Sequence, residues 1–467
     1  MKNRSYMKKN LFLTNISIVI LFLNGLSVFG QEEKVTPDST VNFIDRTTAT
    51  YLLDEGRELY QYGAMRMALR KFREAYVRDK YNEKVAYWIG LTHYAMNNFG
   101  YALEYAKIAR ELSKNTKGET YLLLGESYHR IAKLDSAEIN YKKAIEELSN
   151  TKERIFEVER KLEEVKKAKA LNIENVFTRR KLMDLNINSG YDDYGTVFSS
   201  DGKTLYFISR RPDTKGGNVN SDDQRYFEDI YFSTLEKNKE TWSKASNDIG
   251  RLNSDGFDGV SDISKDGSTI YITLNTSDLD ERGTTQSSDI YFSKKATDGS
   301  WMAPKPIDGR SINTSFYDGN PTLTADGKKM YFVSGREGGK TRSDIYVAES
   351  RDGVFWGQVE KLPEIINSEG NETTPFITPD GKYLFFSSDA RDGIGGYDVY
   401  VSEKMGETWS EPVNLGPSIN SVNDDLFFKY YPELMKAFVS AYRIQGNKAG
   451  LDIFEIYISG WKIPEKK

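Results

Sequence analysis

The sequence contains no cysteine and only two histidines, and both shortages narrow the chemistry open to this protein. Without cysteine there are no disulfides, no lipid-modified N-terminal cysteine and no thiol nucleophile, so stability must come from packing. The two histidines, His93 and His129, lie in the N-terminal third of the chain. A Ser-His-Asp triad or a histidine-based metal site is therefore not expected in the remaining two-thirds.

Long apolar runs are also scarce, and the one that approaches membrane-spanning length lies at the N-terminus. There the basic stretch MKNRSYMKKN precedes LFLTNISIVILFLNGLSVFG, which ends in the small residue Gly30. This order is typical of a secretory signal peptide, so we expect cleavage after Gly30 and an exported protein. An uncleaved membrane anchor is the alternative, since the run is nearly long enough to cross a bilayer.

Positive charge is in deficit once that segment is removed. Residues 1–30 carry four basic residues and no acidic one, which leaves 60 basic and 69 acidic residues and a net charge of −9. An acidic protein is a poor partner for nucleic acid, so we expect none. The aromatic content is high, with 30 Tyr and 24 Phe, and favours folded β structure in a chain long enough for two or three domains.

A helical pattern repeats three times between residues 50 and 150. Gly56, Gly90 and Gly125 lie 34 and 35 residues apart, and each is followed after twelve residues by an alanine and after seven more by another. Small residues at these spacings let two antiparallel helices approach closely. The charged amphipathic segment 151–170 follows and is predicted to cap the stack.

This pattern resembles the tetratricopeptide repeat (TPR). The resemblance implies that the first helix of each hairpin lines a concave groove that binds peptide segments, and aromatic and arginine side chains are common anchors of such partners. The alternative is a spacer whose groove is filled by the neighbouring domain. Carried over position by position, the groove residues are Arg57, Tyr60, Lys84, Tyr87, Tyr94, Glu126, His129 and Arg130.

A second repeat fills the rest of the chain in five copies. Each copy has an Asp-Gly slot, replaced by Glu433 in the fifth, then an Asp-Ile-Tyr-like segment and a tryptophan. Asp-Gly suits a two-residue hairpin turn in which both central residues have positive φ. The alternation of apolar and polar residues around it indicates strands, four per copy, as in a β-propeller blade. The Asp-Ile-Tyr-like segments begin at Asp229, Asp289, Asp344, Asp398 and Asp452.

These copies resemble the WD-repeat-like, TolB-type propeller repeats of Bacteroidetes envelope proteins. They predict five blades, with six as the alternative, and we expect residues 177–182 to meet the C-terminal tail in one blade and close the ring. The predicted fold class is α+β and multidomain. It comprises a signal peptide (1–30), a linker (31–49), an α-helical TPR solenoid with its capping helix (50–170) and an all-β five-bladed propeller (171–467).

An acidic residue lies eight positions before each Asp-Gly slot, at the expected start of the innermost strand. Five such carboxylates would ring one mouth of the channel, where oxygen ligands suit calcium or magnesium. The alternative, which we favour, is that each carboxylate caps backbone N–H groups, so no metal or other cofactor is predicted. The five residues are Asp193, Asp258, Asp318, Glu372 and Asp425.

Four arginines follow the second strands of their copies. We expect them to form structural ion pairs with the aspartates of the Asp-Ile-Tyr segments, and exposed pairs of this kind contribute only about 0 to 1 kcal/mol each. These arginines are Arg210, Arg336, Arg391 and Arg443.

The order of modules resembles the N-terminal part of OmpA-family and PorE-like proteins of type IX secretion. It implies an exported interaction scaffold, in the periplasm or at the outer membrane, that binds envelope proteins through the groove or a propeller face. The sequence ends at Lys467 with no OmpA-like domain, so direct binding to peptidoglycan is not expected.

Two other functions are alternatives to the scaffold. One is a ligand-binding propeller that takes a cation, a glycan or a peptide terminus at its channel mouth. The other is a hydrolase, since two carboxyl groups suffice to cleave a glycoside. Because the repeating acids single out no pair, we predict that the protein is not an enzyme.

Overall fold

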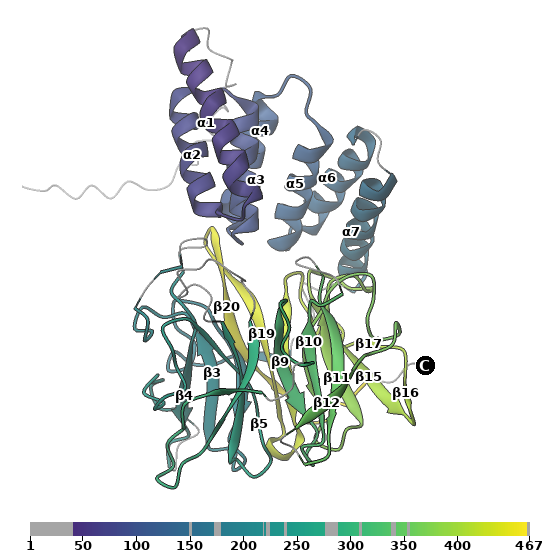
Figure 1. Cartoon of the computed structure of the whole chain (residues 1–467). Helices are drawn as coiled ribbons and strands as arrows, with labels where there is room; N and C mark the ends of the chain where they lie inside the picture. Colours follow the sequence, from purple (N-terminus) through teal and green to yellow (C-terminus); the bar gives the residue numbers. More distant parts are fainter. Residues whose placement is uncertain are drawn as a thin grey trace, which may run out of the picture. The chain divides into compact units, whose positions relative to one another are not determined.

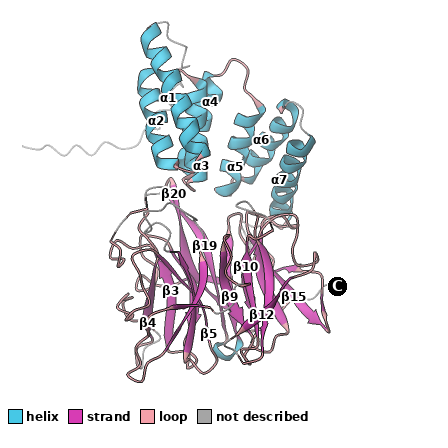
Figure 2. Cartoon of the chain, viewed as in Figure 1, coloured by secondary structure: helices cyan, strands magenta, loops and turns pink. Residues whose placement is uncertain are grey.

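The computed structural model describes residues 41–148, 152–171, 179–217, 219–220, 225–237, 241–275, 288–307, 311–337, 342–352 and 355–464. The predicted signal peptide and most of the linker lie outside these residues. Helices come first along the chain and strands follow (Figures 1 and 2), which confirms the predicted fold class. No helix in the described ranges is long and apolar enough to cross a membrane.

Among the described residues, seven α-helices form the N-terminal part, and consecutive helices pair into hairpins. Their bounds are α1 Phe43–Gln61, α2 Met65–Arg78, α3 Glu83–Ala95, α4 Phe99–Leu112, α5 Gly118–Arg130, α6 Leu134–Glu147 and α7 Lys152–Ala170. The repeated glycines mark close helix approaches, because a Cβ on Gly56 would lie 2.4 Å from the Phe72 ring and one on Gly125 would lie 2.6 Å from Tyr141. The TPR-like helical repeat is thus confirmed.

Helix α7 covers the last hairpin with an apolar face. Its buried residues Val158, Leu162 and Val165 pack with Tyr141 of α6, and Ile394 from the propeller joins the same cluster. The predicted capping helix therefore has a second role, because it also packs against the propeller. Residues 37–467, which hold both helices and strands, form one compact unit.

The strands of the described residues form five antiparallel sheets, as the five sequence copies predict. The first blade contains β2 (Asp193–Phe198), β3 (Thr204–Ser209) and β4 (Asp229–Thr234), and the second contains β5 (Phe257–Ile263), β6 (Thr269–Asn275), β7 (Asp289–Lys294) and β8 (Lys305–Pro306). The third contains β9 (Asp318–Leu323), β10 (Lys329–Ser334), β11 (Asp344–Ser350) and β12 (Trp356–Lys361). The fourth contains β13 (Glu372–Ile377), β14 (Tyr383–Ser388), β15 (Asp398–Met405), β16 (Thr408–Trp409) and β17 (Val413–Asn414).

The fifth blade joins the two ends of the propeller sequence. Its order is β18 (Asp425–Tyr431), β19 (Lys436–Gln445), β20 (Lys448–Tyr457) and then β1 (Arg180–Leu182), in which Leu182 pairs with Phe454. The predicted ring closure is confirmed for Arg180–Leu182, whereas residues 177 and 178 lie outside the described residues. Trp461 of the tail packs in the same blade, 5.9 Å from the Tyr430 ring.

The Asp-Gly turns differ from the prediction in one respect. Only the glycine has positive φ, for example +68° at Gly202, and Asp201 does not. The Gly202 N–H donates to the Ser199 carbonyl at 2.8 Å, while the Asp201 carboxylate accepts from the Lys203 N–H at 3.0 Å. The turn is therefore not the two-residue turn with two positive φ angles that was predicted.

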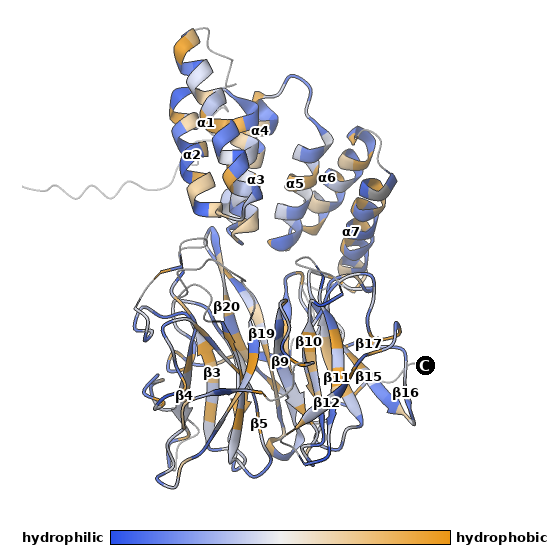
Figure 3. Ribbon diagram, viewed as in Figure 1, coloured by the Kyte–Doolittle hydropathy of each residue, from blue (hydrophilic) through white to orange (hydrophobic). Residues whose placement is uncertain are grey.

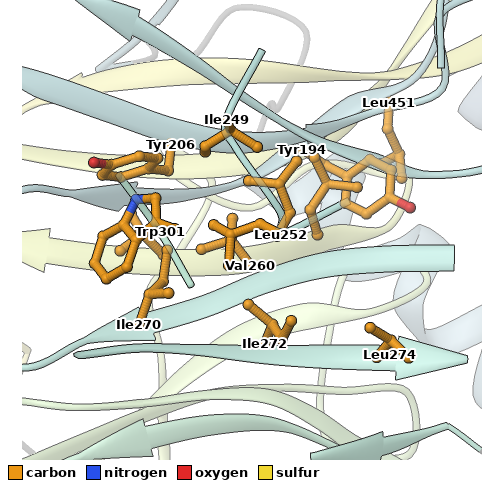
Figure 4. Packing of buried hydrophobic residues seen from close by; sticks show 13 residues of the cluster. Tyr194, Tyr206, Ile249, Leu252, Val260, Ile270, Ile272, Leu274, Trp301 and Leu451 are labelled. Carbon is orange, nitrogen blue, oxygen red and sulfur yellow. The ribbon is translucent and has the colours of Figure 1, made fainter. Parts of the chain in front are cut away.

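The propeller core lies between neighbouring blades. Side chains of the first blade, such as Tyr194 and Tyr206, pack against Val260, Ile270 and Trp301 of the second (Figure 4). Figure 3 shows apolar stretches along the strands and mostly hydrophilic loops. Each blade is thus buried on both faces, which leaves the loops and the channel mouth for function.

Candidate functional site

The five carboxylates predicted at the channel mouth are buried inside the blades. Each has an exposed fraction of 0%, and each accepts from the backbone N–H and the hydroxyl of a Ser or Thr four residues earlier. Asp318, for instance, accepts from the Thr314 N–H and Oγ1, both at 2.6 Å. The hypothesis of an acidic ring at the mouth is therefore wrong, and the capping alternative describes Asp193, Asp258, Asp318, Glu372 and Asp425.

Within the described ranges, no group of three or more His, Asp or Glu side chains is placed to hold a metal ion. The carboxylates of the inner-strand starts act as structural caps, since buried polar groups need hydrogen-bond partners.

An asparagine that sequence reasoning missed lies five positions before each capping acid. Asn420 accepts from the Val399 N–H at 2.9 Å and donates to the Val399 carbonyl at 3.0 Å, as a neighbouring strand would. The same pair of hydrogen bonds joins each of the four other asparagines to the third strand of a blade. These strands are β20, β4, β7 and β11. The signal was present as Ile/Leu-Asn-Ser/Thr in all five copies, beginning at Ile187, Leu252, Ile312, Ile366 and Ile419.

The arginines were assigned mostly to the wrong partners. Arg336 pairs with the capping Asp318 at 2.9 Å, and not with Asp344. Arg391 lies 3.9 Å from Glu372. Only Arg443 pairs as predicted, with Asp452. The loop after the second strand folds back over the inner-strand start, which brings its arginine to the capping acid.

The first two blades also depart from the prediction. Arg211 pairs with Asp193 at 3.0 Å, whereas Arg210 donates to the Tyr226 carbonyl at 2.7 Å. In the second blade, the described residues supply no cation within ion-pair distance of Asp258. Burial raises the pKa of the Asp258 carboxyl to about 7.

One half of the predicted helical groove is open and aromatic. Tyr60 and Tyr87 both make T-shaped contacts with Trp88, with ring centroids 5.3 and 6.0 Å away, and the Arg57 guanidinium lies 5.4 Å from the centroid of the same ring. Lys84 is exposed beside them. Trp88 is the centre of this cluster, although it was not among the predicted groove residues.

The other half of the groove is occupied by the protein itself. Arg130 pairs with Asp424 of the propeller at 2.9 Å and donates to the Tyr94 hydroxyl at 3.4 Å. Glu126 pairs with Lys161 of α7 at 3.1 Å. For Arg130, the alternative in which the neighbouring domain fills the groove describes the structure, whereas Glu126 pairs within the helical domain.

The histidines take no part in an open site. Nε2 of His129 lies 3.1 Å from the Ile394 carbonyl, and burial lowers the pKa of this imidazole to about 3. His93 is buried in the helical core, and its pKa is lowered to about 4 by burial. Both rings are therefore neutral over the whole physiological pH range.

A cavity of about 480 Å³ opens at the channel mouth. Its aromatic lining comes from all five blades, and its polar lining is mostly hydroxyl and amide side chains. Glu228 is the one carboxylate among the described lining residues. The aromatic residues are Tyr194, Phe257, Tyr317, Tyr397 and Phe427.

Strained backbone forms part of this cavity. Asn320, Thr374 and Phe427 each have φ near +50° and line the cavity at bulges in the inner strands. A β-branched residue such as Thr374 rarely adopts this conformation. Hydroxyls of the preceding blade hold the bulges, because Asn320 N–H donates to Thr273 Oγ1 at 2.9 Å and Phe427 N–H to Thr374 Oγ1 at 3.1 Å.

Comparison with known proteins finds no matching protein-family model and no matching curated protein. Among solved structures, the first TPR of Spaghetti (RPAP3), bound to an HSP90 peptide, is 20% identical and covers 27% of this chain and 95% of its own, with a TM-score of 0.25. An α-L-arabinofuranosidase from Fusarium graminearum is 12% identical over 60% of this chain and 98% of its own, with a TM-score of 0.36.

A family 117 glycoside hydrolase from the marine bacterium Zobellia galactanivorans is similar as well. It is 14% identical and covers 59% of this chain and 88% of its own, with a TM-score of 0.35. The prediction that the protein is not an enzyme is therefore wrong in excluding enzymatic activity, because the propellers to which this chain is similar include glycoside hydrolases. That prediction rested on the repeating acids, which single out no pair of carboxyl groups for glycoside cleavage.

Proposed function

We propose that this protein is an exported interaction scaffold of the bacterial cell envelope, in which the open half of the helical groove binds an extended segment of a partner protein. TPR-like and propeller folds are typical protein-interaction scaffolds. The envelope location is supported by the N-terminal sequence, whose basic, apolar and small residues follow the order of a signal peptide. A secretion or outer-membrane assembly is the setting that the order of modules favours.

The observation that carries this proposal is the cluster around Trp88. Phe72 stacks on the Trp88 ring from the helical core, Tyr60 and Tyr87 meet it at steep angles, and the ring stays partly exposed. The cations of Arg57, over the ring, and of Lys84 are exposed at the surface. Aromatic and arginine side chains that are held in place by neighbours lose little entropy on binding, and they supply much of the energy at interfaces. The paired residues at the other end, Arg130 and Asp424, restrict a partner to the open half.

A pull-down from cross-linked cell envelopes tests the proposal. The Tyr87→Ala variant is expected to lose a stoichiometric partner that the wild-type protein captures. Tyr62→Ala is the matched control, because Tyr62 is a highly exposed tyrosine at the end of α1, outside the cluster. Equal recovery with both variants, or no partner with the wild type, would contradict the proposal.

A further inference from the structure

One position in the innermost strands carries a different residue in each of the five blades. It lies four residues after the capping acid and pairs with an aromatic residue of the second strand, as Lys429 does with Phe438. The repeat itself therefore does not account for the one lysine and the one aspartate at this position. The five residues are Val197, Asp262, Thr322, Phe376 and Lys429.

The Lys429 side chain reaches a blade that is not its neighbour. Lys429 belongs to β18 of the fifth blade and is buried. Its Nζ donates to the carbonyl of Ser261, on β5 of the second blade, at 2.8 Å. The first blade lies between these two, because its innermost strand β2 packs against both β18 and β5. The hydrogen bond therefore joins two blades across the inside of the ring.

The surroundings of Lys429 come from every blade. A cavity of about 10 Å³ beside it is lined by residues of all five blades, so the side chain lies in the channel and not only between two sheets. The Lys429 Nζ also lies 5.0 Å from the centroid of the Phe376 ring, which belongs to the fourth blade. An ammonium group at this distance from an aromatic ring is attracted to its face.

Asp262 of the second blade supplies the opposite charge. Burial lowers the pKa of the Lys429 amine, and the Asp262 carboxylate opposes that shift. Burial likewise raises the pKa of Asp262, and the charge of Lys429 opposes it. The Asp262 Oδ2 accepts from the Leu323 N–H of the third blade at 2.7 Å. Because a buried charge is costly without such partners, these two residues depend on each other.

The ring has one seam that the chain does not cross between consecutive blades. The first to fifth blades follow one another in sequence, whereas the fifth meets the first through side-chain packing and through the pairing of the short strand β1 with β20. Opening of the ring at this seam would expose the edges that closure removes.

We propose that Lys429 and Asp262 form an axial latch, a buried ion pair that ties the fifth blade to the second across the channel and so spans the seam between the fifth blade and the first. The Asp262–Leu323 bond extends the latch to the third blade. This device keeps the ring closed independently of β1, and it does not depend on the partner-binding function proposed above.

Thermal melts of the whole protein test whether the two residues act as a pair. Lys429→Met leaves the Asp262 carboxylate without its cation, so the melting temperature should fall by roughly 5 °C or more. Adding Asp262→Asn removes the unpaired charge and should recover part of this loss, although Asp262→Asn alone should be destabilising. Lys329→Met, which breaks an exposed pair with Glu349, is the control and should change little. Additive effects of the two changes, or a wild-type melting temperature for Lys429→Met, would overturn the proposal.

Hydrogen exchange measured by mass spectrometry tests where the ring opens. Without the latch, amide exchange should become faster on both sides of the seam, in β18 and β20 of the fifth blade and in β2 of the first, while β10 and β11 of the third blade stay as in the wild type. The Lys429→Met/Asp262→Asn variant is the one to measure, because it lacks the latch but holds no unpaired buried charge and is expected to fold even where Lys429→Met does not. Faster exchange confined to β18, or spread equally over all five blades, would overturn the proposal.

Discussion

Arg130 of helix α5 and Asp424 of the propeller form an ion pair at 2.9 Å that links the helical and β parts of the chain. Both side chains are largely buried, and the same arginine donates to the Tyr94 hydroxyl. A second link lies one hairpin away, where Asn97 Nδ2 donates to the Tyr442 hydroxyl at 2.7 Å. These bonds make one end of the groove part of a structural junction.

Breaking the Arg130–Asp424 pair should destabilise this junction. Arg130→Ala leaves the Asp424 carboxylate buried without its cation, so a loss on the order of 2 kcal/mol or more in unfolding free energy is expected. Arg57→Ala removes the arginine of an exposed pair with Asp54 and should change stability little. Denaturant titrations of both variants provide the measurement. Equal effects would show that the junction does not depend on this pair.

Two capping aspartates should respond oppositely to replacement by asparagine. The pKa of Asp258 in the folded protein is about 7, above its usual 3.8, so ionisation favours unfolding. Its stability contribution is therefore greatest at low pH and is lost as pH rises toward 7. Asp258→Asn removes this loss and should raise the unfolding free energy by about 1 kcal/mol at pH 8, with a smaller gain at pH 5.

Asp318→Asn is the matched control for that pH series. Asp318 caps the same kind of turn but pairs with Arg336 at 2.9 Å, so the variant should be destabilised at both pH values. Thermal melts at pH 5 and pH 8 compare the two. A destabilised Asp258→Asn protein at pH 8 would mean that its carboxylate is stabilised by a charge.

The repeated asparagines should each contribute to blade stability. Asn367 Oδ1 accepts from the Ile345 N–H at 2.8 Å, and its Nδ2 donates to the Ile345 carbonyl at 2.9 Å. Asn367→Ala leaves both buried groups without these bonds, so a loss of about 1 to 3 kcal/mol is expected. Asn367→Asp retains the acceptor but not the donor and should also be destabilised. Chemical denaturation measures the unfolding free energy of both variants. Wild-type stability of either variant would refute the view that Asn367 bonds to β11 as a neighbouring strand would.

The features predicted correctly from sequence are those that local repetition encodes. Gly56 and Gly125 identify close helix approaches because only a residue without a side chain fits against Phe72 and Tyr141. The ring closure was predictable for a related reason. Five copies leave one strand position empty at the C-terminus and one spare segment at the N-terminus, and Arg180–Leu182 fills that position.

The site was predicted less well, because side-chain direction and contacts between distant segments are not local properties. The acids at the inner-strand starts were expected at the mouth, yet Ser and Thr four residues earlier turn them inward, as Thr314 does with Asp318. His129 and Arg130 fit a groove by position but meet the propeller at Ile394 and Asp424. The spacing of the repeats does not predict which propeller loop lies opposite which helix.

The most direct test of the scaffold function is photo-cross-linking in cells with a photoreactive amino acid placed at single positions. With the probe at Tyr87 or Lys84, in the open half of the groove, we expect cross-links to one defined partner protein. With the probe at Tyr62, at the end of α1, or at Val77 on α2, both highly exposed, we expect none. Cross-links of equal yield at all four positions, or none at Tyr87 and Lys84, would contradict the proposal that this groove binds a partner.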